Sequence, residues 1–141
     1  MTIRPLLLAA AVALASGAAA QAATQKFSAT LTGAAEVPAN TETGTGKVDA
    51  TLDTDAKVLT YTAAYSGLTG PAGAAHIHGP AEPGANAPPV VMIASAASPI
   101  SGSAALTDAQ VADLQAGKMY LNVHTAAHRG GELRGQLKPA M

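Results

Sequence analysis

The sequence contains no cysteine and no tryptophan, and it has one phenylalanine and three tyrosines. The absence of cysteine excludes disulfide bonds, thiolate metal sites and cysteine nucleophiles. The scarcity of aromatic rings argues against a surface that stacks on nucleic-acid bases. Charge is sparse as well, because eight Lys and Arg oppose nine Asp and Glu and the cations are scattered. We therefore expect no binding to nucleic acid or to an anionic membrane surface.

The first 22 residues have the pattern of a secretory signal peptide. Arg4 supplies a positive charge, residues 6–15 form an apolar run of about ten residues, and Ala-x-Ala cleavage patterns end at Ala20 and Ala22. The apolar run is too short to cross a bilayer as a helix. We therefore expect a signal peptide over residues 1–22 and a periplasmic or secreted protein. Residues 23–141 should form one domain with no membrane span.

The rest of the chain alternates apolar and polar residues in short runs, which is the pattern of β-strands. One short helix is expected after Thr107, because Thr107 and Gln110 form a capping-box pattern and Gly117 closes the run. About seven to eight strands with one short helix predict an all-β, antiparallel, Greek-key-like sandwich or barrel. The expected strands cover residues 26–31, 47–52, 58–65, 75–78, 90–94, 102–106, 119–124 and 132–137.

All four histidines of the chain lie in two short motifs, AHIHG at residues 75–79 and NVHTAAHRGG at residues 122–131. Alternate residues of a strand point to the same face, so His76 and His78 should project together while Ile77 turns inward. Their Cα atoms would lie about 6.5–7 Å apart, and two imidazoles can close that gap around one ion.

In the second motif, Leu121 and Val123 are expected in the core and His124 on the other face of the strand. If this strand lies near the first motif, a third imidazole joins the first two. His128 follows across a short turn and is the candidate for a fourth ligand. A pair of histidines on a strand is often only polar surface, so a role in packing or hydrogen bonding stays open. The predicted metal ligands are His76, His78, His124 and His128.

Other polar and sulfur-bearing residues have expected roles around this site. Glu132 is a candidate to orient a ligating histidine through its free ring nitrogen, and Arg134 to attract an anion toward the metal. Met92 and Met119 are expected to fill the core rather than to bind metal. Glu36 stands in a Val-Pro context and is expected to anchor a turn.

Six short segments follow one another along the chain: FSATLTG at 27–33, EVP at 36–38, GL at 67–68, AHIHG at 75–79, YLNVHT at 120–125 and GELRGQL at 131–137. Taken in this order, they resemble the chordin-type (CHRD) domain family, which occurs in bacterial secreted proteins and as repeats in animal chordin. The resemblance covers about residues 27–137 and identifies 23–141 as a CHRD domain. It implies a β-sandwich or barrel of immunoglobulin-like or superoxide-dismutase-like appearance and leaves the activity undefined.

The strand with His76 and His78, together with His124, also resembles the copper-binding histidines of copper/zinc superoxide dismutases. The paired cysteines of those enzymes are absent here, and so is an obvious histidine-rich zinc loop. This likeness therefore suggests a copper site more strongly than it suggests dismutase activity.

Three or four imidazoles without a thiolate suit Cu(II) or Zn(II), and raw affinity favours copper. Three functions remain open at this point. The first is a copper-binding protein for metal buffering or delivery, with zinc as the alternative metal. The second is a non-catalytic structural or partner-binding domain, and the third is a copper-dependent, dismutase-like enzyme. A hydrolase or a nucleotide-binding protein has no support, because no serine stands in a nucleophile elbow and no glycine loop has the phosphate-binding setting.

Overall fold

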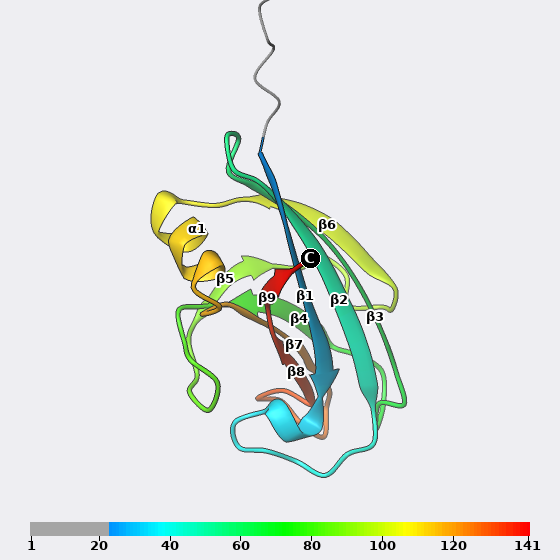
Figure 1. Ribbon diagram of the computed structural model, residues 1–141. Coiled ribbons are helices and arrows are strands. Elements are labelled where there is room, and N and C mark those ends of the chain that lie inside the picture. The colour runs from blue at the N-terminus through cyan, green and yellow to red at the C-terminus, as the bar shows by residue number, and fades with distance from the viewer. Residues whose placement is uncertain (1–22) are drawn as a thin grey trace, which may run out of the picture.

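The computed structural model describes residues 23–141 (Figure 1). The predicted signal peptide, residues 1–22, lies outside the described residues. The elements are β1 (Thr24–Thr32), the 3-10 helix η1 (Gly33–Ala35), β2 (Thr45–Asp53), β3 (Val58–Ser66), β4 (Ala74–His78), β5 (Pro89–Met92), β6 (Ile100–Ala105), α1 (Asp108–Gln115), β7 (Tyr120–His124), β8 (Leu133–Gln136) and β9 (Lys138–Ala140). No helix in this part of the chain is long and apolar enough to cross a membrane.

The strands form one antiparallel sheet in the order β5-β4-β7-β8-β1-β2-β3-β6, with β9 paired to β1. Figure 1 shows the sheet folding over on itself, so that β4 and β7 lie behind β1 and β2 in a nearly closed barrel. The order is not sequential, since β4 lies beside β7 and β8 beside β1. The predicted all-β antiparallel barrel with one short helix is confirmed.

The core lies between the two halves of the curved sheet. In β3 every second side chain is buried, as the alternating sequence predicted, and β2 pairs with it over its whole length. Complete burial of one such aliphatic side chain contributes about 1.5–3 kcal/mol to stability. Side chains from both halves meet there, including Phe27, Val48, Leu59, Ile77 and Leu121, each exposed by 2% or less.

Helix α1 begins and ends where the sequence predicted. The Thr107 side chain accepts a hydrogen bond from the Gln110 amide, and the Gln110 side chain accepts one from the Thr107 amide. Gly117 follows the helix with a φ of 74°, a left-handed conformation that glycine adopts without strain. Leu114 anchors the helix to the core.

Strands β7 and β8 are covered on both faces. The segment 79–88 folds over their outer face, and the Gln136 amide donates to the Ala81 and Gly117 carbonyls. Arg134 is only 1% exposed. Of the two methionines predicted for the core, Met119 is buried, whereas Met92 is 67% exposed, so that prediction was wrong for Met92.

Candidate metal centre

Three of the four histidines lie together on the outer face of the neighbouring strands β4 and β7. The two strands are antiparallel, and their register places His124 opposite Ala74 and Asn122 opposite His76. Residues opposite one another share a face of the sheet, and so do alternate residues such as His76 and His78. The ring centroids are 5.5 Å apart for His76–His78, 4.9 Å for His76–His124 and 6.2 Å for His78–His124. The expected meeting of the two histidine motifs is confirmed.

One ring nitrogen from each of these histidines lies within 4.8 Å of the other two. The closest pair is His76 Nδ1 and His124 Nε2, which are 3.1 Å apart. Two nitrogens that bind one ion at ~2.0–2.1 Å, at an angle between about 90° and 110°, lie about 2.9–3.4 Å apart. This pair therefore already has the spacing of two ligands of one ion. Within residues 23–141 no other group of three His, Cys, Asp or Glu side chains meets this spacing.

Main-chain carbonyls fix which nitrogen of two of the rings is free. His78 Nδ1 donates to the Ala87 carbonyl at 2.8 Å, and His124 Nδ1 donates to the Arg129 carbonyl at 2.9 Å. Because a carbonyl can only accept, the proton of each neutral ring is on Nδ1 and the lone pair is on Nε2. His78 Nε2 is buried and has no hydrogen-bond partner. A bound ion would supply that partner, so the donor set fits a metal.

The position of the proton on the third ring, His76, follows from the protonation of His124. When the rings are neutral, His124 Nε2 can only accept, so His76 Nδ1 donates to it across the 3.1 Å contact. Binding of an ion between these nitrogens would require the His76 proton to move to Nε2, and no proton would leave the ring. The hydrogen bond thus occupies the place of the metal in the metal-free protein.

The surroundings keep the rings in the form that binds metal. Burial lowers the pKa of His76 below 6.5, and repulsion from His124 and His78 lowers that pKa further. Burial also lowers the pKa of His78; the hydrogen bond to Ala87 opposes this effect without cancelling it. Neutral imidazole is the ligating form, so these shifts favour metal binding at neutral pH.

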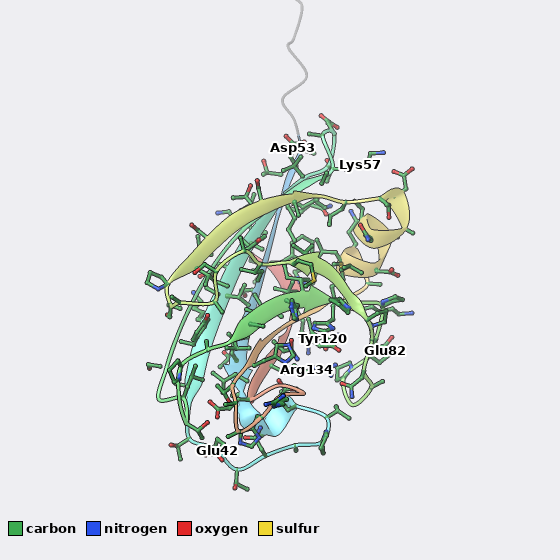
Figure 2. All side chains as sticks on the ribbon, turned by 180° about the vertical axis from the view of Figure 1, so that it is seen from behind. Glu42, Asp53, Lys57, Glu82, Tyr120 and Arg134 are labelled. Carbon is green, nitrogen blue, oxygen red and sulfur yellow. The ribbon has the colours of Figure 1, made fainter. Side chains whose placement is uncertain are left out.

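A stacked pair of side chains holds His78 in place. The His78 ring lies parallel to the Tyr120 ring, at 4.9 Å between centroids and 5° between planes. The Arg134 guanidinium lies over the Tyr120 ring at 3.5 Å, and Figure 2 shows the two side chains beside each other. The Tyr120 hydroxyl accepts from the Ala87 amide and donates to the Ala87 carbonyl. Tyr120 therefore fixes the main-chain group that orients His78.

Arg134 does not have the role expected for it. Its guanidinium is buried against Tyr120 and donates to Asn86 and to the Glu82 carbonyl, so it holds the segment 79–88 over the sheet. Because Arg134 is buried, an anion in solvent cannot reach its guanidinium. The side chain instead stabilises the packing of segment 79–88 on the sheet.

His128 lies apart from the other three histidines. Its Nε2 is 3.0 Å from Glu42 Oε1 and 3.9 Å from Glu132 Oε1. Glu132 is fully buried and accepts hydrogen bonds from the amide and the hydroxyl of Thr69. Glu132 therefore does not orient a clustered histidine; the main-chain carbonyls of Ala87 and Arg129 do so for His78 and His124. His128 instead lies near the carboxylates of Glu42 and Glu132.

Several contributors to the site were missed in the sequence. The Ala87 and Arg129 carbonyls have no signature, since any residue offers a carbonyl. Tyr120 had one, because alternation places it on the same face of β7 as His124. Glu36, which was expected to anchor a turn, is not part of the three-histidine cluster; it is a buried carboxyl, 4% exposed, whose Oε1 has no hydrogen-bond partner.

Comparison with known proteins agrees with the segments that carry the histidines. The family model described as the CHRD domain matches residues 27–137, which is well over half of the chain and includes all three clustered histidines. No curated protein and no solved structure matches the chain.

Proposed function

The chain belongs to the CHRD domain family, and we propose that it binds one copper ion through His76, His78 and His124. The observation that carries the proposal is the convergence of three ring nitrogens, two of which have their lone pairs fixed by main-chain carbonyls. This arrangement is typical of histidine ligands, in which one ring nitrogen binds the metal and the other donates a hydrogen bond to a neighbouring group. His128 is left out of this ligand set.

Copper is the metal that this donor set favours. Three imidazoles without a thiolate suit Cu(II) and Zn(II), and nitrogen sites bind Cu(II) more tightly than Zn(II). An exported protein, as the N-terminal sequence suggests, would meet copper in an oxidising compartment as Cu(II). Zinc is the alternative metal.

The position of the site supports buffering or delivery of the metal. His76 and His124 are partly exposed and line an open hollow of about 530 Å3 together with Arg129, Pro71 and Ala126. No acidic residue lines this hollow among the residues described. A site at the surface lets an ion enter and leave by exchange of ligands, whereas catalysis would need a positioned base or a substrate pocket.

Titration of the protein with Cu(II) and with Zn(II) tests the proposal. We expect one equivalent of Cu(II) to bind, more tightly than Zn(II), and His76→Ala and His124→Ala to weaken binding by at least about a hundredfold. His128→Gln is the matched control, because it removes an imidazole that lies outside the cluster, and it should leave affinity and stoichiometry unchanged. Unchanged binding in both alanine variants would refute the site.

Tyr120→Phe tests the support of His78. The substitution keeps the stacked ring and removes the two hydrogen bonds to Ala87, which should loosen the carbonyl that orients His78. Loss of such an outer contact typically weakens metal binding by about 10–100-fold, and we expect the lower end of that range. The measurement is the same Cu(II) titration, with thermal unfolding of the metal-free variant to confirm that it folds. Wild-type affinity in a folded variant would contradict the role of Tyr120.

A further inference from the structure

Met92 stands out among the apolar side chains because it lies in the open. It is 67% exposed, and the only other large apolar side chain exposed within residues 23–141 is Met141 at the chain end. The next residues inward on the same strand are partly or fully buried. Core packing therefore does not explain the thioether at this position.

The register of the sheet places Met92 beside the histidine cluster. In the β4–β5 pair, Met92 is directly opposite His76. The Ile93 amide donates to the Ala75 carbonyl at 3.3 Å, so Ala75–Ile93 is a hydrogen-bonded pair and His76–Met92 is the pair without hydrogen bonds. In such pairs the Cα atoms are only about 4.5 Å apart and the side chains are closest. The thioether and the His76 imidazole thus share one face as immediate neighbours.

The Met92 side chain has the freedom to reach a metal held by His76. It is unbranched, with three rotatable bonds, and it borders an open hollow of about 420 Å3 at the gap between the edges β5 and β6. At 67% exposure, most of the side chain lies in solvent, which leaves it room to change rotamer. Strand β4 lies between β5 and β7, so Met92 and His124 flank the His76 side chain on its two sides.

We propose that Met92 is a fourth ligand, a thioether that joins the three imidazoles when the site holds Cu(I). Soft thioether sulfur selects Cu(I), whereas imidazole binds Cu(II) and Zn(II) without it. The site would then bind copper in either oxidation state, and Met92 would make it select Cu(I) over Zn(II). This inference rests on the proposed copper site at His76, His78 and His124.

The test compares Met92→Leu with Met141→Leu in the full chain. Leucine keeps the apolar bulk of methionine and removes the sulfur, and Met141 is a matched exposed methionine far along the chain. Cu(I) affinity is measured anaerobically by competition with a chromogenic Cu(I) chelator, and Cu(II) and Zn(II) affinities by titration. We expect Met92→Leu to weaken Cu(I) binding by about tenfold or more, to leave Cu(II) and Zn(II) within about twofold, and Met141→Leu to change nothing.

X-ray absorption of the Cu(I) protein gives a second readout. A copper–sulfur scattering path should be present in the wild type and absent in Met92→Leu. Equal Cu(I) affinity in Met92→Leu and the wild type, or a sulfur path that persists in Met92→Leu, would overturn the inference. If either of these results is found while His124→Ala still weakens Cu(II) binding, the copper site stands and only the role of Met92 is refuted. If His124→Ala leaves Cu(II) binding intact, the proposed site itself fails.

Discussion

Copper is expected to leave the protein as the pH falls below the ordinary histidine pKa of about 6.5, because a protonated imidazole must lose its proton before it can bind metal. With three imidazoles, the dissociation constant should rise by up to about three orders of magnitude for each unit of pH below the ring pKa values. Above pH 7 the affinity should depend little on pH. The steep dependence is a direct consequence of a site built from histidine alone.

The pKa shifts set where the release begins. Burial lowers the pKa of His76 and His78 below 6.5, so protons compete less well for these rings than for exposed histidines. The lowered pKa values therefore favour retention of the metal, and copper should stay bound to a lower pH than it would on three solvent-exposed imidazoles. A site that starts to lose metal well above pH 6.5 would contradict the burial of these rings.

The measurement is the Cu(II) dissociation constant at a series of pH values between 4 and 8. His76→Gln should reduce the limiting slope from about three to about two orders of magnitude per pH unit, because one titrating ligand is gone. His128→Gln should leave the slope unchanged, since that ring lies with Glu42 instead of in the cluster. Full occupancy at pH 4 would exclude imidazole ligation.

The strands and the shared face of His76 and His78 could be predicted because both follow from local patterns. Alternation in residues 58–65 fixes which side chains of β3 are buried, whatever the rest of the fold is. The i, i+2 spacing of His76 and His78 places both on one face of β4 in any strand. That His124 would lie beside them was suggested by the likeness to the copper-binding histidines of the dismutases, and it depends on the pairing of β4 with β7 that the register shows.

The rest of the site depends on segments whose path no local pattern encodes. The segment 79–88 could equally have stood away from the sheet, and its closure over β7 and β8 is what buries Arg134 and delivers the Ala87 carbonyl. Met92 stands in the continuous apolar run 90–94, which is typical of a buried strand, but it lies on the outer face of an edge strand. His128 lies in the turn after β7, where its Nε2 is 3.0 Å from Glu42 Oε1, a partner far away in the sequence.

A buried carboxyl group lies beside Asn122 of β7, close to the histidine face. Glu36 is 4% exposed, and burial raises its pKa from 4.5 to about 7 against the opposing effect of Arg134. Space around it is tight: a Cβ built on Gly131 would lie 2.3 Å from Glu36 Oε1 and 2.7 Å from Asn122 Nδ2. A carboxylate in this place has lost water on all sides, and its Oε1 has gained no hydrogen bond in return.

Glu36→Gln is therefore expected to stabilise the protein at alkaline pH. A carboxyl whose pKa is raised in the folded state contributes stability below its unfolded pKa of 4.5, and that contribution is lost as the pH rises through about 7. The shift corresponds to about 3 kcal/mol at about 1.4 kcal/mol for each pKa unit. Glutamine resembles the protonated acid at every pH, so the variant should avoid this loss.

Urea unfolding at pH 8.5 and at pH 4 measures the effect in the metal-free protein. The free energy of unfolding of Glu36→Gln should exceed that of the wild type by about 3 kcal/mol at pH 8.5 and by little at pH 4. Glu82→Gln is the control, because that side chain is 67% exposed and its charge is solvated. A variant no more stable than the wild type at pH 8.5 would mean that Glu36 is solvated or paired when ionised.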